Sequence, residues 1–310
     1  MEQGVPALGL SSPDGLLKTR VSLTGADLTT LRIGGEIRRL LEPRSESMLA
    51  SMMRQLNMER SGFLVIGGGS NVLMTDGVLE TPLILTTGIN EVSVREDGGV
   101  VFVSCGAGVR LRDVLAMTVR EGWSGLEFAA GIPGTVGGAV MGNAGTLRGE
   151  IASAVHSVRA SRFDGRFFDF GDGMIEWGYR KCSLRDEAPM VVSNVVFRLR
   201  RSARESVIEE TSRSASDRRN QPSGRMTAGC VFRNPPGESA GRLLELAGCK
   251  GLSVGGAVVS EIHANFIENS GGATASDFAD LAQRCREKVI ERFGIRLRFE
   301  IMTLGVSLED

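Results

Sequence analysis

The chain has 310 residues, a formal net charge of −1 and a hydrophobic share of 42%, which is typical of a globular protein large enough for two domains. The near-zero charge gives no electrostatic reason to expect a nucleic-acid or membrane-surface partner. No run approaches the roughly 18 apolar residues of a membrane span, and residues 1–26 lack the basic start and apolar stretch of a signal peptide. We therefore expect a cytoplasmic protein.

The cysteine and histidine content argues against a metal site. The five cysteines are widely scattered without metal-ligand spacing, and only two histidines are present. An odd, scattered set of cysteines is not a disulfide framework. We expect free thiols in a reducing compartment and no bound metal.

The N-terminal part contains a leader and one amphipathic helix. Residues 1–26 are rich in turn residues and are interpreted as a leader. Met48, Leu49, Met52 and Leu56 recur at helical spacing, which predicts a helix over 45–56 packed by one face. These methionines are best explained as core filler.

Two glycine-rich loops, Gly67–Asn71 and Gly131–Gly138, are the most informative local feature. Glycine lets backbone N–H groups approach phosphate oxygens, and successive amides in such turns bind anions. A Rossmann fingerprint needs a glycine at the sixth position and a helix starting there. Val72 holds that position, and Asp76-Gly77 and Pro82 leave no room for a crossover helix. The loops predict a dinucleotide site of non-Rossmann type.

The middle of the chain consists mostly of short β-type runs. One helix, over 111–121 and stopped by Gly122, interrupts them. This is an α+β pattern rather than strict βαβ alternation. A charged helix from about 203 to 219 follows, is ended by Pro222 and connects to a second unit. The runs are 63–66, 83–85, 92–95, 100–104, 154–160, 167–170 and 190–199.

The last hundred or so residues have their own helices and strands. A helix over 239–247 is stopped by Gly248, strand-like runs cover 256–259 and 264–267, and a helix over 277–293 ends at Gly294. Thr274 precedes that helix in a capping-box arrangement. The chain then alternates over 295–301, with Glu300 on the polar face of an edge strand.

Three places carry polar groups suited to chemistry, although each also has a structural explanation. Arg180 beside Tyr179 is by default a surface arginine next to a core tyrosine. The loop 227–236 presents Cys230 and Asn234, but a cysteine between glycine and valine usually acts as a small buried hydrophobe. Glu300 is by default a salt-bridge partner. Spacing alone leaves both interpretations of each residue open.

Taken together, these segments resemble one known family. The chain resembles the UDP-N-acetylenolpyruvoylglucosamine reductases (MurB), in matches that run in order from about residue 27 to 305. The direct passage from Tyr179 to the C-terminal unit resembles the shorter form of the enzyme, which lacks an extra tyrosine loop. The matching segments are 29–35 (TTLRIGG), 65–71 (VIGGGSN), 125–145 (GLEFAAGIPGTVGGAVMGNAG), 178–180 (GYR), 219–222 (RNQP), 228–235 (AGCVFRNP) and 254–269.

The resemblance implies a fold and a reaction. The fold is a flavin-binding module of the vanillyl-alcohol-oxidase (PCMH) type in two subdomains over 27–201, after the leader 1–26. A C-terminal α+β substrate-binding domain follows over 202–310, its last strand returning toward the flavin site. NADPH reduces non-covalently bound FAD, which passes hydride to the enolpyruvyl group of UDP-N-acetylglucosamine enolpyruvate. The product is UDP-N-acetylmuramate for peptidoglycan.

The resemblance also assigns roles to residues. Arg180 and Glu300 stabilise charge, and Cys230 stands where the family usually has a serine proton donor. A free thiol with a pKa of about 8.5 is mostly protonated at neutral pH, although a basic environment that lowered this pKa would deplete the donor. Substrate contacts fall to Tyr179, Asn234 and Arg233, the last a candidate for the UDP phosphates. The residues expected to bind FAD are Gly67, Gly68, Gly69, Ser70, Asn71, Gly131, Ile132, Pro133, Gly134, Thr135 and Gly138.

Two other functions remain as alternatives. A flavin oxidase of the same superfamily would use oxygen and commonly carry a covalently linked flavin. A non-catalytic nucleotide-sugar-binding module would keep the fold without turnover.

Overall fold

The structure is a computed structural model that describes residues 23–187 and 189–308. The helices are α1 (Gly25–Leu28), α2 (Glu46–Met58), α3 (Leu111–Glu121), α4 (Val136–Met141), α5 (Arg204–Ser216), α6 (Ala240–Leu246) and α7 (Ala275–Phe293). Short 3-10 helices cover Thr86–Gly88, Glu127–Ala129, Ile151–Ser153 and Ser183–Arg185. No helix in the described ranges is long and apolar enough to cross a membrane. Most of the predicted leader lies outside the described residues.

A small parallel sheet carries the first glycine-rich loop. Its order is β1 (Leu40–Leu41), β4 (Leu83–Leu85), β2 (Leu64–Ile66). Helix α2 packs beside it through Leu49, Met53 and Leu56, which share a core with Ile84. Ser45 caps α2 by accepting a hydrogen bond from the Met48 N–H. The helix predicted over 45–56 and its methionine packing are confirmed.

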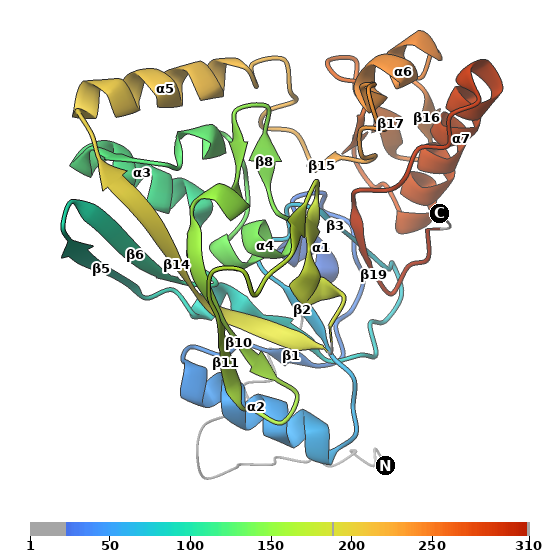
Figure 1. Cartoon of the computed structure of the whole chain (residues 1–310). Coiled ribbons are helices and arrows are strands. Elements are labelled where there is room, and N and C mark those ends of the chain that lie inside the picture. The colour runs from blue at the N-terminus through green and yellow to red at the C-terminus, as the bar shows by residue number, and fades with distance from the viewer. Residues whose placement is uncertain (1–22, 188, 309–310) are drawn as a thin grey trace, which may run out of the picture.

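A six-stranded antiparallel sheet forms the centre of the molecule. Its order is β11 (Phe167–Phe170), β10 (Val155–Arg162), β14 (Met190–Arg201), β6 (Val100–Gly106), β5 (Val92–Asp97), with β7 (Trp123–Ser124) added at the end of β14. One face buries Val103 and Phe197 against α3 and α4, while α2 covers the other face near Val191. Figure 1 shows α3 and α2 on opposite sides of this sheet. An antiparallel sheet of this kind confirms the α+β prediction.

The C-terminal part has a four-stranded antiparallel sheet and two packed helices. The order is β15 (Thr227–Cys230), β18 (Phe266–Asn269), β17 (Ala257–Val259), β16 (Ser253–Val254). Thr274 and Asp277 form the capping box of α7, which ends at Gly294 with a left-handed φ of 68°. Three residues of the N-terminal part, Leu31, Ile33 and Leu73, are buried in the same core as Phe278. The division into domains at 201/202 remains a prediction.

Two short hairpins and a final parallel pair complete the fold. The hairpins are β8 (Gly145–Thr146) with β9 (Gly149–Glu150), and β12 (Trp177–Gly178) with β13 (Lys181–Cys182). The last strand, β19 (Met302–Leu304), pairs in parallel with β3 (Val72–Met74), which directly follows the first glycine-rich loop. Figure 1 shows the chain returning from the C-terminal part to this position.

Two expectations from the sequence were wrong in detail. The segment 295–301 alternates in burial as predicted, yet it forms only a single bridge, Phe232 to Phe299, instead of an edge strand. The backbone of this segment changes its hydrogen-bonding partner before a ladder can form. Glu300 N–H donates to the Val231 carbonyl, whereas Met302 N–H donates to the Asn71 carbonyl. In addition, α4 is a second helix among the β-runs, where the glycines of the sequence suggested only a loop.

Candidate active site

The two predicted glycine-rich loops lie against each other. A Cβ atom on Gly134 would come within 2.7 Å of Ser70 Oγ, and one on Gly68 within 3.1 Å of Gly134 Cα. Gly69, Gly131 and Gly134 also have φ values of 61°, 76° and 101°, in the region that favours glycine. These glycines therefore allow two distant segments to form one backbone-lined surface.

The first loop offers unpaired backbone donors. Within the part of the chain that the structure describes, the N–H groups of Gly68, Gly69 and Ser70 donate to no protein acceptor. Successive free amides of a turn form an anion-binding concavity. This fits the pyrophosphate of a dinucleotide such as FAD.

The second loop contributes in a different way from the first. Gly131 and Gly134 lie in the loop itself, but Gly138 is inside α4, where its N–H donates to the capping Thr135 Oγ1 at 3.5 Å. The Ile132 side chain is buried in the core, and Pro133 is exposed. Only the backbone of Ile132 is therefore available to a ligand.

Arg180 and Glu300, which are 120 residues apart in sequence, form an ion pair. Arg180 Nε donates to Glu300 Oε1 at 2.7 Å, and the two side chains are 25% and 16% exposed. Arg180 Nη2 also donates to the Gly145 carbonyl at 3.1 Å. The guanidinium is thereby fixed from two directions.

The backbone of Arg180 is held in an unusual conformation. Arg180 is the second residue of the two-residue turn between β12 and β13 and has a φ of 54°. A non-glycine residue pays about 1–2 kcal/mol in this left-handed region. Asn143 Nδ2 donates to the Gly178 carbonyl at 2.9 Å and so braces the turn. Strain maintained in this way is typical of functional sites.

Burial sets the protonation tendency of Glu300. Removal from water raises the pKa of its carboxyl, and the positive charges of Arg180 and Arg233 oppose that rise. The side chain is thus bonded to a donor and also easier to protonate than an ordinary glutamate. The bond from Arg180 and the raised pKa both reduce the repulsion that an ionised carboxylate would exert on negative charge developing nearby.

Cys230, at the edge of the C-terminal sheet, lies near the Arg180–Glu300 pair. It ends β15, and the bridge from Phe232 to Phe299 brings its segment alongside Glu300. Although its side chain keeps some solvent exposure, burial raises the pKa of the thiol to about 12, and the Glu300 charge acts in the same direction. Arg180 and Arg218 lower it by a smaller amount. The three predicted catalytic residues therefore lie within one electrostatically connected site.

The three predicted substrate residues are grouped beside this site. The backbone N–H of Asn234 donates to the Tyr179 hydroxyl at 3.4 Å, and Tyr179 is 53% exposed. Asn234 Oδ1 accepts from the Ala240 N–H at 3.0 Å, so part of this side chain fixes the start of α6. Among the described residues, the buried Nε of Arg233 has no hydrogen-bond partner.

Sequence reasoning missed two arginines of the site. Arg218 lies over Gly131, with its Nε 3.2 Å from the position a Cβ atom would take there, and its charge acts on Cys230 and Arg180. Arg185 interacts with Arg233, and burial lowers its pKa. Arg218 directly precedes the matched RNQP segment, which was the available signal. Such guanidinium groups suit carboxylate and phosphate ligands.

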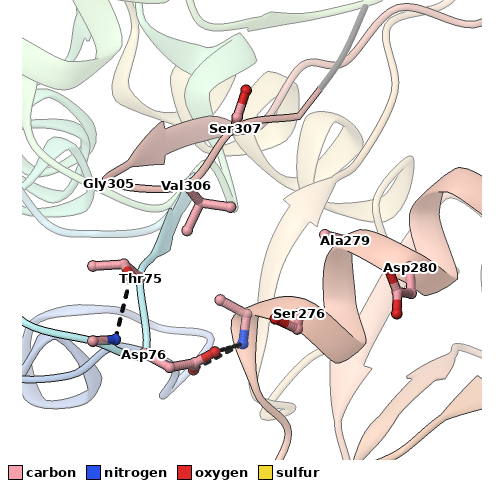
Figure 2. Close-up of a pocket in the computed structure, with 10 residues that line it drawn as sticks. Thr75, Asp76, Ser276, Ala279, Asp280, Gly305, Val306 and Ser307 are labelled. Atoms are coloured by element: carbon pink, nitrogen blue, oxygen red, sulfur yellow. Dashed lines mark hydrogen bonds between the residues drawn. The ribbon is translucent and has the colours of Figure 1, made fainter.

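A separate pocket of about 410 Å³ lies next to α7 and contains none of the predicted site residues. Figure 2 shows Asp76 reaching the first turn of α7 in this pocket. Both Asp76 carboxylate oxygens accept from the Ala275 N–H at 2.8 Å. The pocket is lined by Thr75, Asp76, Gly77, Ala275, Ser276, Ala279, Asp280, Gly305, Val306 and Ser307.

The described residues give no alternative site based on metal or disulfide chemistry. Within 23–187 and 189–308, no group of three His, Cys, Asp or Glu side chains is arranged to hold a metal ion. All five cysteines are free thiols.

Comparisons with known proteins agree with this arrangement. A family model for an FAD binding domain matches residues 37–171, which confirms the expected flavin module. A model for the C-terminal domain of UDP-N-acetylenolpyruvoylglucosamine reductase matches residues 221–304. The fold is similar to the crystal structure of the reductase (MurB) from Thermus caldophilus, with a TM-score of 0.77, 34% identity and coverage of 91% of this chain and 98% of that chain.

Reductases of the same name are similar over most of their length. The one from Bacillus pumilus is 36% identical, covering 90% of this chain and 92% of its own. The one from Anaplasma marginale is 36% identical, covering 99% of this chain and 100% of its own. The chain therefore belongs to the UDP-N-acetylenolpyruvoylglucosamine reductase family.

Proposed function

We propose that this chain reduces the enolpyruvyl group of UDP-N-acetylglucosamine enolpyruvate to give UDP-N-acetylmuramate, with NADPH as reductant and Cys230 as proton donor. The observation that carries the proposal is the Arg180–Glu300 ion pair beside Cys230, next to two abutting glycine-rich loops. Membership of the family supports the reaction class.

The loops Gly67–Asn71 and Gly131–Gly138 would hold FAD non-covalently through backbone amides. When bound, FAD would supply the hydride-transfer chemistry that links oxidation of NADPH to reduction of the substrate. The close packing of Gly68 and Gly134 and the unpaired amides of the first loop support this assignment. Added Cβ atoms would push the two loops apart, because one on Gly134 would meet Ser70 Oγ and one on Gly68 would meet Gly134 Cα.

Arg180 would stabilise the charge that develops during reduction. Hydride addition at the β-carbon of an enol ether beside a carboxylate pushes negative charge into that carboxylate. The guanidinium is already oriented by Glu300 and Gly145, and its Nη1 has no hydrogen-bond partner among the described residues. A hydrogen-bond donor that is already oriented stabilises the transition state most when it points at the atoms where charge develops.

Cys230 would then protonate the α-carbon. Because burial raises the pKa of the thiol to about 12, Cys230 stays protonated at neutral pH and the donor is not depleted. The proton passes from Sγ to the carbon, and the thiolate left behind lies near Arg180 and Arg218 until it is reprotonated by water. A general acid must hold its proton before the step and release it during the step.

Tyr179, Arg233 and Asn234 would contact the nucleotide sugar. The buried, unpaired Nε of Arg233 and the adjacent charge of Arg185 support an anion-binding role there. A cytoplasmic location is part of the proposal and is supported by five free thiols.

The test is an anaerobic assay of the purified flavoprotein. NADPH should bleach the flavin spectrum, and the enolpyruvyl UDP-sugar should restore it with formation of UDP-N-acetylmuramate. In a parallel aerobic assay, turnover with oxygen as the only electron acceptor, together with flavin retained in the acid precipitate, would favour a flavin oxidase. Binding of the UDP-sugar without any NADPH consumption would favour a non-catalytic module, and either result removes the proposal.

A further inference from the structure

Asn71 belongs to the loop expected to bind FAD, but its side chain makes a hydrogen bond to the Glu300 backbone. Asn71 Nδ2 donates to the backbone carbonyl of Glu300 at 3.2 Å. The carbonyl of Asn71 accepts from the Met302 N–H at 3.0 Å. Asn71 therefore holds the chain on both sides of Ile301, through the peptide before it and the peptide after it.

Glu300 has no regular ladder to hold its backbone. The parallel pairing of β3 with β19 begins only at Val72 and Met302. On its other side, Glu300 N–H donates to the Val231 carbonyl at 2.8 Å, next to Cys230. One side-chain amide, that of Asn71, thus fixes the carbonyl at the point where the chain changes partners.

The rest of the contact between β3 and β19, which we call the β3–β19 seam, is fixed independently of Asn71. The ladder continues through Thr303 and Leu304, and Thr75 N–H donates to the Leu304 carbonyl at 2.9 Å. Farther along, Asp76 binds the first turn of α7 (Figure 2). Loss of the Asn71 amide should therefore change the local direction of Glu300 without releasing β19.

We propose that Asn71 is a positioning residue for the reduction: its side-chain amide sets the backbone of Glu300, and so the Arg180–Glu300 pair, relative to the glycine-rich loop. The inference rests on the proposed function of that pair. It gives the side-chain amide of Asn71 a role in the substrate half of the reaction, beyond any contact of this loop with FAD.

The effect should be confined to one half-reaction. Reduction of the flavin by NADPH does not require charge stabilisation by Glu300, whereas reoxidation by the enolpyruvyl substrate does. A displacement of about 1 Å at a reacting group can cost about 100-fold in rate. Asn71→Asp keeps the size and removes the donor, and Asn71→Ala removes the whole amide.

The experiment measures three quantities on holoenzymes of both variants: the FAD-to-protein ratio after desalting, the rate of flavin reduction by NADPH, and the rate of reoxidation by the enolpyruvyl UDP-sugar. We expect normal FAD content, reduction within about twofold of wild type, and reoxidation slowed by about 10–100-fold. The matched control is Asp76→Ala, which lies beyond the β3–β19 seam and away from the Arg180–Glu300 pair. It should lower thermal stability without slowing reoxidation more than reduction.

A double-mutant cycle supplies the decisive comparison. In a Glu300→Gln background, Asn71→Ala should slow reoxidation by less than about threefold, because residues that act as a unit are not additive. Additive losses, loss of FAD from both Asn71 variants, or equal slowing of both half-reactions would overturn the proposal. A wild-type protein that is never reoxidised by the UDP-sugar would instead remove the proposed function.

Discussion

Replacement of Cys230 by alanine tests the proton transfer most directly. The substitution removes the only proton on the Cys230 side chain that can be donated and leaves the glycine-rich loops and the Arg180–Glu300 pair in place. General acid catalysis by a positioned side chain contributes about 100- to 10,000-fold to rate. We therefore expect Cys230→Ala to slow reoxidation by the enolpyruvyl substrate within that range, while NADPH still reduces the flavin at close to the wild-type rate.

The structure also fixes the expected pH dependence. Burial raises the pKa of the Cys230 thiol from 9.0 to about 12, a difference that corresponds to about 4 kcal/mol against the thiolate. A group with a raised pKa keeps its proton until the pH reaches that value. The donor form should therefore persist through pH 10, and iodoacetamide should alkylate Cys230 far more slowly than an ordinary free thiol between pH 7 and 10.

Two measurements check this reasoning. Stopped-flow absorbance of the flavin separates reduction from reoxidation, and mass spectrometry after brief alkylation at several pH values reports the thiolate. Cys230→Ser is the conservative control and should retain part of the activity, because a hydroxyl can occupy the same place. Normal reoxidation in Cys230→Ala, or an alkylation midpoint below pH 9, would refute the assignment of Cys230 as a thiol proton donor.

Three further predictions concern other parts of the site. Burial raises the pKa of the Glu300 carboxyl, so its acid form persists to higher pH than that of an ordinary glutamate and is lost as the pH rises. Glu300→Gln, which cannot ionise, should therefore abolish the fall in reoxidation rate that accompanies this titration; an unchanged pH profile would contradict this. Gly134→Ala should lower FAD affinity, measured by fluorescence titration, because its Cβ would lie 2.7 Å from Ser70 Oγ at a φ of 101°; wild-type affinity would be the contrary result. Asn143→Ala should lower the free energy of unfolding by about 1–3 kcal/mol in urea, because Asn143 is fully buried and bonds to Gly178 and Ala152. A loss below about 0.5 kcal/mol would show that neither hydrogen bond matters.

The sequence predicted best those elements whose signals are local. The helix α7 has a capping box at its start, an apolar stripe along it and Gly294 at its end, so its position followed from neighbouring residues alone. The glycine-rich loops were recognisable for the same reason, because glycine marks places where the backbone must come close to something.

Other features depended on partners distant in sequence. The strand β19 starts at Met302 because Asn71 and Val72 lie beside it, and no pattern within 295–301 contains that information. Arg218 belongs to the site because it lies over Gly131, and Arg185 because it interacts electrostatically with Arg233. Apart from the RNQP segment that directly follows Arg218, no local pattern distinguishes these two arginines from surface residues.

The burial of Leu31, Ile33 and Leu73 within the core around Phe278 has a practical consequence for engineering. An excised fragment beginning near residue 202 would present an uncovered apolar surface where these three side chains belong, and exposed surface of this kind promotes aggregation. Chimeras between relatives should therefore exchange the segments 29–35 and 71–74 together with the C-terminal part from about residue 202. The physical module boundary in this chain is discontinuous in sequence.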